Sequence, residues 1–150
     1  DKNESIIYRG EDNSYYEKFL ATGEVKCIDE EIPFEIPQGW EWSRMGSIGD
    51  WGAGATPAKG NTSYYGGNIL WLRTGELNNS IVNDTEIKIT DKALKECSLR
   101  LNKAGDVLIA MYGATIGKVA IAGCELTTNQ ACCACTPIGI FNYYLFYFLM

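Results

Sequence analysis

The sequence predicts an α+β fold that consists mainly of β-strands. Short apolar runs alternate with glycine-rich turns over most of the chain, a spacing that is typical of strands. Two stretches have helical character, Asp91–Cys97 and Tyr143–Met150. A chain of 150 residues has room for one ordinary domain with its own core, so we expect a single domain.

The first 31 residues are expected to form an acidic leader or linker. They are charged and polar, and neither helical nor alternating periodicity persists over a useful length. Pro33 and Pro37 then restrict the backbone twice in quick succession, which is typical of a boundary. The domain proper is therefore predicted to span residues 32–150. Gln38–Trp42 alternates polar and apolar residues, which predicts its first strand.

The remaining elements follow from periodicity and from glycine. The glycine-rich stretch Gly46–Gly67 is predicted to be mostly loop. Thr90 or Asp91 is placed to cap the helix Asp91–Cys97. A second helix is expected to start at Asn142 and to be the beginning of a longer one. The apolar runs predicted to form strands are Ile69–Arg73, Glu86–Ile89, Val107–Met111 and Val119–Ala122.

The charge of the chain argues at first against a nucleic-acid partner. The formal net charge is −6, whereas affinity for DNA depends largely on basic residues that neutralise phosphates. Residues 1–35 contain ten acidic and four basic residues, but residues 36–150 contain nine of each. The acidity belongs to the predicted leader, which leaves a neutral domain able to present a local basic face.

The cysteines indicate a reducing environment, and the hydropathy indicates a soluble chain. The cluster Cys132, Cys133 and Cys135 lacks CxxC spacing, and the chain has no histidine to complete a mixed metal site. Buried reduced thiols are favoured over a metal or redox role, which fits the cytoplasm. No apolar run reaches the length of a membrane helix, so we expect no membrane association and no signal peptide.

Several chemistries are disfavoured by the motifs. Gly113–Lys118 has one residue too few between its glycines for a P-loop and lacks the following hydroxyl. Gly52-Ala53-Gly54 runs into Pro57 where a dinucleotide fingerprint would need its third glycine. The absence of histidine removes the commonest catalytic base. Asp84 and Glu86 lie on a polar segment, which favours a solvated face over a catalytic pair.

Three loops instead carry side chains suited to recognition. Arg73 can address guanine or a phosphate, and Glu76 can accept from cytosine, although an internal Arg73–Glu76 salt bridge is equally expected. Asn129 and Gln130 can read adenine or pin a turn, with the structural role favoured. The residues that we predict to contact DNA are Lys59, Asn61, Tyr64, Tyr65, Arg73, Thr74, Glu76, Tyr112, Thr115 and Lys118. For Tyr64 and Tyr65, core packing with a satisfied hydroxyl is an equally open alternative.

The chain resembles the target-recognition domain of a type I restriction-modification specificity (S) subunit. The resemblance rests on WLRTGEL at Trp71–Leu77, GDVLIAMYGATIGKVAI from Gly105, and TTNQACC from Thr127, together with the entry around Ile36–Trp42. It covers roughly Ile32 to Met150. It implies a fold like the specificity domain of DNA methylases, with a double β-helix-like body and a C-terminal helical hairpin that is truncated here to its first turns.

The resemblance also implies a function and a set of partners. Each recognition domain of such a subunit reads one half of a split site in double-stranded DNA. Long helices dock the methyltransferase (M) subunits, and a separate motor-nuclease (R) subunit translocates and cleaves. The chain itself is then expected to be non-catalytic, to need no cofactor or metal, and not to bind S-adenosylmethionine. It has no Asn-Pro-Pro-Tyr/Phe tetrad, in agreement with that role.

A module that binds peptides or proteins through aromatic, glycine-rich loops is the alternative. Salt separates the two classes, because DNA binding weakens steeply as salt is added and peptide binding weakens less. The target sequence stays open at this point, since readout depends on loop geometry and on DNA deformability. The sequence also leaves open whether this is a first or a second recognition half.

Overall fold

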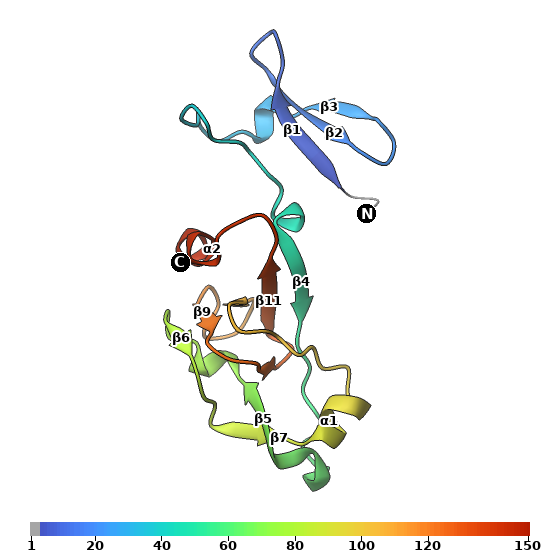
Figure 1. Cartoon of the computed structure of the whole chain (residues 1–150), viewed down its shortest axis with the longest axis vertical. Coiled ribbons are helices and arrows are strands. Elements are labelled where there is room, and N and C mark those ends of the chain that lie inside the picture. Colours follow the sequence, from blue (N-terminus) through green and yellow to red (C-terminus); the bar gives the residue numbers. More distant parts are fainter. Residues whose placement is uncertain (1–3) are drawn as a thin grey trace. The chain divides into compact units, whose positions relative to one another are not determined.

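The computed structural model describes residues 4–150, which form two compact units (Figure 1). The first unit ends at Ile48, and the second comprises Gly49–Met150. The division therefore falls later in the chain than the domain boundary expected at residue 32. Among the described residues, no helix is long and apolar enough to cross a membrane.

The first unit is built on a small antiparallel sheet in the order β1-β2-β3. Its strands are β1 (Ser5–Arg9), β2 (Tyr15–Phe19) and β3 (Val25–Cys27), and a 3₁₀ turn η1 (Asp29–Glu31) follows. Asn13 adopts a φ of 68° in the turn between β1 and β2, a conformation that asparagine tolerates well. The residues expected to form a leader thus contain three strands. These strands are too short to show periodicity in the sequence.

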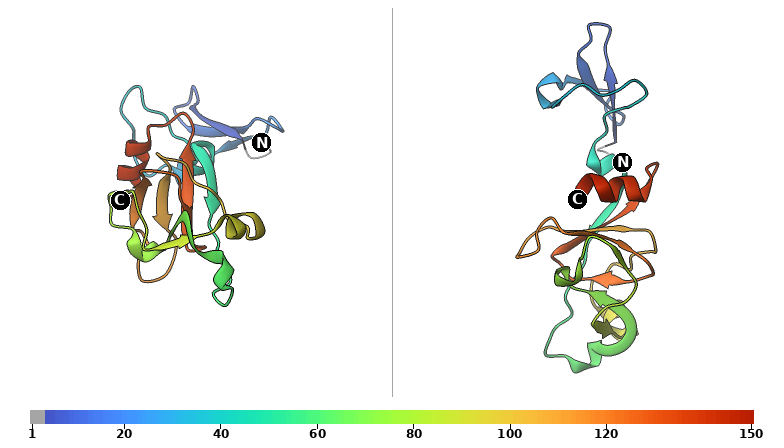
Figure 2. Two further views of the ribbon diagram at one scale, coloured as in Figure 1. Left: turned by 60° about the horizontal axis from the view of Figure 1, so that its bottom comes forward. Right: turned by 90° about the vertical axis from the view of Figure 1, so that its left-hand side faces the viewer.

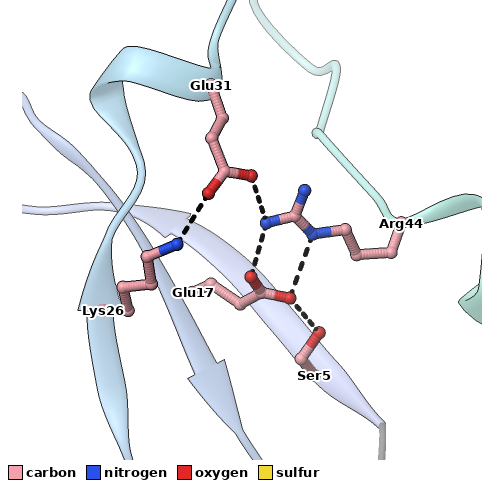
Figure 3. A network of polar contacts seen from close by, with 5 residues as sticks. All are labelled: Ser5, Glu17, Lys26, Glu31 and Arg44. Atoms are coloured by element: carbon pink, nitrogen blue, oxygen red, sulfur yellow. Dashed lines mark hydrogen bonds and ion pairs between the residues drawn. The ribbon is translucent and has the colours of Figure 1, made fainter.

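An ion-pair network fastens Arg44 to this sheet (Figure 3). Arg44 Nη2 lies 2.6 Å from Glu17 Oε2, and Arg44 Nε donates to Glu17 Oε1 at 3.1 Å. The same Nη2 lies 2.7 Å from Glu31, which also pairs with Lys26 at 2.9 Å. Glu17 is 4% exposed, and Arg44 holds the pKa of its carboxyl below the usual value. The network explains why the first unit extends past the predicted boundary.

The strand predicted at Gln38–Trp42 is wrong. Gly39 has a φ of 87°, and Trp40 N donates to Pro37 O at 3.1 Å, so this segment begins with a turn and continues without regular structure. The Trp42 ring packs against Phe34, with 5.2 Å between ring centroids. The alternation of polar and apolar residues therefore reflects a packed loop. A 3₁₀ turn, η2 (Met45–Ser47), ends the unit.

The second unit contains a five-stranded sheet in the order β4-β11-β8-β9-β6 (Figure 2). The β6–β9 pair is parallel and the other pairs are antiparallel. A smaller sheet has the order β10-β5-β7, with β10 parallel to β5 and β7 antiparallel to it. The bounds are β4 (Gly49–Ala53), β5 (Tyr65–Leu72), β6 (Ile81–Val82), β7 (Ile87–Ile89), β8 (Val107–Ala110), β9 (Val119–Ala122), β10 (Thr127–Thr128) and β11 (Cys132–Pro137).

The mainly β fold predicted from the sequence is confirmed, and four of its strands were placed correctly. Gly46–Gly67 is mostly loop, as expected, but it also contains β4 and the start of β5. Glycine serves here for close packing of strands. A Cβ at Gly49 would lie 2.8 Å from the carbonyl oxygen of Thr136 on β11, too close for any other residue without a shift.

Two helices complete the second unit. In α1 (Asp91–Glu96) the Thr90 hydroxyl accepts from Ala93 N at 3.3 Å, which confirms the predicted cap. The helix α2 (Asn142–Leu149) packs on β8 and β9 and buries Leu145 and Phe146. The main core cluster joins the end of β5 to the five-stranded sheet and contains Leu72, Leu77, Val82, Leu108, Ala110, Ala120, Ala122, Leu126, Cys132 and Ala134.

The cysteines match the expectation of buried thiols in part. All six are free. On β11, burial raises the pKa of the Cys132 thiol to about 12 and that of Cys135 to about 11. Cys27, by contrast, is exposed on β3. No group of three metal-ligating side chains occurs among residues 4–150.

Candidate nucleic-acid interface

The end of β5 leads directly into three predicted contact residues. Arg73, Thr74 and Glu76 lie at or within the 3₁₀ turn η4 (Thr74–Glu76). Glu76 accepts hydrogen bonds from two backbone amides, that of Arg73 at 2.9 Å and that of Glu86 at 2.8 Å. The Arg73 guanidinium pairs with the carboxylates of both Glu76 and Glu86. The internal Arg73–Glu76 pair that the sequence left open is therefore present, and Glu76 stabilises the turn.

The loop before β5 and the first residue of β5 provide four more of the predicted residues, and three of them make internal bonds. Asn61 accepts from Ser63 N at 3.1 Å and caps the 3₁₀ turn η3 (Thr62–Tyr64). Tyr64 donates to Glu96 at 3.0 Å, and this bond raises the pKa of the phenol. Tyr65 donates to the carbonyl of Pro57 at 2.6 Å. Lys59 is exposed.

Tyr65 belongs to a small aromatic corner that shapes this loop. Its ring meets Trp71 edge-on with 6.3 Å between centroids, and Trp71 Nε1 donates to the carbonyl of Ala55 at 3.0 Å. Burial raises the pKa of the Tyr65 phenol. Ala55 and Pro57 are thus hydrogen-bonded to β5, so the structural role that the sequence allowed for Tyr65 is the one the contacts support.

The hairpin between β8 and β9 presents the last three predicted residues. Tyr112 is 49% exposed, Lys118 is exposed and Thr115 is half-buried. Gly117 N donates to Ala110 O at 3.0 Å, and Lys118 N donates to Thr115 O at 3.0 Å. This hairpin tip, residues 111–118, therefore projects from a hydrogen-bonded base.

Two polar turns lie beside the base of the hairpin tip. Asn79 Oδ1 accepts from Val119 N at 3.1 Å, and Asn79 N donates to Val119 O at 2.9 Å. Met111 N donates to Ala131 O at 2.8 Å, which places the Asn129–Ala131 turn alongside. Gln130 in that turn is exposed and bonds to Thr56. Asn79 was not identified from the sequence as part of this site, although the pair Asn78-Asn79 before a strand is typical of a turn.

The predicted residues fall into two groups rather than one. Tyr112, Thr115 and Lys118 gather with the Asn79 and Asn129 turns, and Asn129 N donates to Leu72 O at 2.9 Å, next to Arg73. Lys59, Asn61, Tyr64 and Tyr65 precede or begin β5, where Tyr64 contacts α1 through Glu96 and Lys92. The two groups are thus separated by the length of β5.

Charge distinguishes the first group. The segments that carry it, residues 77–81, 109–121 and 126–133, contain no aspartate or glutamate, and Lys118 is their single charged residue. Strand pairing among β6, β8, β9 and β11 brings these segments together. These segments therefore bring no carboxylate of their own to the hairpin tip that would repel a polyanion.

A family model for the type I restriction modification DNA specificity domain matches residues 37–150. The chain is 38% identical over 117 residues to the MjaIX specificity subunit of Methanocaldococcus jannaschii, covering 75% of this chain and 27% of that protein. It is 30% identical over 101 residues to the EcoR124I/EcoR124II specificity subunit of Escherichia coli, covering 65% of this chain and 25% of that protein. The chain spans about a quarter of the length of these relatives.

The fold is also similar to that of solved structures. The HsdS subunit from Thermoanaerobacter tengcongensis superimposes with a TM-score of 0.64 at 20% identity, over 78% of this chain and 28% of that one. A chain from a structure of the type I R-M system gives the same TM-score at 21% identity, again over 78% of this chain and 28% of that one. The specificity-domain fold expected from the sequence is confirmed.

Proposed function

Because the chain belongs to the type I restriction-modification DNA specificity family, we propose that it recognises one half of a split site in double-stranded DNA. The observation that carries this proposal is the exposed hairpin tip with Lys118, on segments without acids and with the Asn79 and Asn129–Ala131 turns beside its base. Lysine contacts phosphates, and asparagine and glutamine match the edges of adenine.

The role within a larger complex follows from the family. We assign recognition to the region from residue 32 onward, with the reading surface in the second unit and α2 as the first turns of a long helix. The M subunits then supply methylation and the R subunit supplies translocation and cleavage, in the cytoplasm. The chain itself binds DNA without catalysis, cofactor or metal, and it leaves S-adenosylmethionine to its partners.

The acidic first unit does not contradict this function. Residues 49–150 contain eight acidic and eight basic residues, so the unit assigned to recognition is neutral. Weak binding by one recognition half is sufficient when two halves and the M subunits act on the same DNA, because linkage raises the effective concentration of each.

A domain exchange tests the proposal directly. The methylation motif of genomic DNA is mapped in cells that express the parent methyltransferase, with this domain present or replaced by an unrelated recognition domain. Replacement should change one half of a split motif and leave the other half intact. An unchanged motif would contradict DNA recognition by this chain and would favour a peptide-binding module.

Single lysines locate the surface within the domain. Lys118→Ala should weaken DNA binding and reduce the slope of log affinity against log salt by about one, the value for one lost phosphate contact. Lys103→Ala is the matched control, because Lys103 is also exposed but precedes β8 at the other end of the same hairpin. Equal effects of the two variants would argue against a surface centred on the hairpin tip.

A further inference from the structure

The hairpin tip carries apolar side chains that the proposed contacts do not use. Ile116 is 67% exposed, Tyr112 is 49% exposed and Met111 is 40% exposed. The strands immediately below are almost entirely buried, with Val119, Ala120 and Ala122 at 1% exposure or less. A well-packed hairpin thus ends in a cluster of large apolar groups, and clusters of this kind mark interaction sites more often than single exposed residues do.

The backbone of the tip is held in one shape. Ile116 N donates to Gly113 O at 3.2 Å, next to the two bonds that tie Gly117 and Lys118 to the base of the hairpin. Gly113 and Gly117 have φ values of 89° and 81°, which other residues adopt at a cost. Ile116 therefore lies on a turn whose backbone is already ordered, so that little backbone conformational entropy is lost when its side chain binds a partner.

The chemistry around Ile116 suits the stacked bases of a duplex. Lys118 stands two residues away, and the turns with Asn79 and Gln130 flank the base of the tip. Residues 107–124 contain no acid. An apolar wedge accompanied by lysine and amide side chains is the combination with which proteins separate a base step while reading its edges.

We propose that Ile116 is a wedge that inserts between two neighbouring base pairs of the bound DNA, with Lys118 on an adjacent phosphate. This inference rests on the proposed function, because it requires that the chain binds duplex DNA through this hairpin. It adds a deformation of the DNA at one step, so that the energy needed to unstack that step contributes to sequence preference.

Base unstacking is measured with a fluorescent adenine analogue. Duplexes that bind the full chain are selected from a randomised pool, and 2-aminopurine is placed at successive positions of the selected sequence. Binding of the wild-type chain should brighten the probe at one step. Ile116→Ala should abolish the brightening and weaken binding about tenfold, the factor expected for losing most of one buried aliphatic side chain.

Ile138→Ala provides the matched control, because Ile138 is 62% exposed but follows β11, away from the hairpin. It should leave both signals unchanged. The side chain of Ile116 is exposed, so its variant should melt like the wild type, and thermal unfolding verifies this.

The outcomes separate the wedge from the function on which it rests. If the chain selects no sequence from the pool even at concentrations that capture weakly bound duplexes, DNA recognition itself fails. If it selects a sequence but no position brightens, or if Ile116→Ala keeps both brightening and affinity, the wedge is overturned while DNA recognition stands.

Discussion

In the Gly52–Pro57 segment, the structure predicts the larger effect of substitution at Gly54, because a Cβ at Gly54 would meet backbone atoms whereas one at Gly52 would meet only the Arg100 side chain. A Cβ built at Gly54 would lie 2.5 Å from the carbonyl carbon of Thr128, and closer still to the carbonyl oxygen and hydroxyl of that residue. Carbon atoms in contact normally stay about 3.5 Å or more apart, so the loop must move by roughly 1 Å. Gly54→Ala should therefore destabilise the second unit.

The magnitude follows from what that movement disturbs. Overpacking a rigid site costs about 1–3 kcal/mol. The shift also weakens the bonds from Gly54 N to Cys132 O at 3.1 Å and from Ala55 N to Thr128 O at 3.0 Å, each worth about 1 kcal/mol. We expect a loss of about 4 kcal/mol in the free energy of unfolding, which corresponds to a fall in Tm of more than about 10 °C for a unit of this size.

Gly60→Ala is the control in the same loop. Nothing lies within 4 Å of a Cβ at Gly60, and its φ is outside the left-handed region, so alanine should be neutral or stabilising by up to about 1 kcal/mol. Both variants are compared by urea unfolding, followed by the NMR signal of the Trp71 indole N–H, which donates to Ala55 O and belongs to a residue that is 4% exposed. A loss below 1 kcal/mol for Gly54→Ala would refute the reasoning, because it would show that the loop is free to leave Thr128.

Two further predictions concern titratable groups. Arg44 lowers the pKa of Glu17 in the folded state. The ionised Glu17 carboxylate therefore stabilises the fold at a pH above its unfolded-state pKa, near 4.5, and this stabilisation is lost as the pH falls through its lower folded-state pKa. Thermal unfolding of β1–β3, followed by NMR between pH 3 and 7, should show a fall at acidic pH that is smaller in Glu17→Gln. If the stability of Glu17→Gln fell at acidic pH as much as that of the wild type, Glu17 would not be the cause. Glu31 and Asp12, whose pKa values are also lowered, are expected to cause the part of the fall that persists in Glu17→Gln. Burial raises the pKa of Cys132 to about 12 and that of Cys135 to about 11, so iodoacetamide at pH 8 should label exposed Cys27 first and these two only after unfolding, as mass spectrometry of the peptides would reveal. Rapid labelling of Cys132 in the native chain would contradict its burial.

The sequence predicted the elements whose signals are local. The helix α1 was found because a threonine cap precedes its apolar face, and β8 and β9 were found because buried strands are continuous apolar runs. The strands β1 and β2 were missed, since each spans only five residues and β1 buries none of its side chains. Alternation at Gln38–Trp42 gave a false strand, because a loop whose Trp42 packs against Phe34 produces the same pattern.

The candidate site was predictable as a set of loops but not as a surface. Which loops meet depends on pairings such as β10 with β5 and β6 with β9, and both are parallel and join distant segments. The bonds that assign Glu76 to its own turn and Arg73 to two carboxylates are also tertiary. A prediction from residue type alone therefore overestimated how many side chains at the end of β5 are free to contact DNA, and it did not identify Ile116.

The distribution of charge resolves the conflict between an acidic chain and a polyanionic partner. A net charge describes the whole molecule, whereas a phosphate responds chiefly to charges within about a Debye length, roughly 8–10 Å at physiological salt. The excess acids lie in the first unit, and in the second unit the segments around the hairpin tip contain none. Adding acids there should thus weaken DNA binding far more than adding them to β3, even though both changes alter the net charge equally.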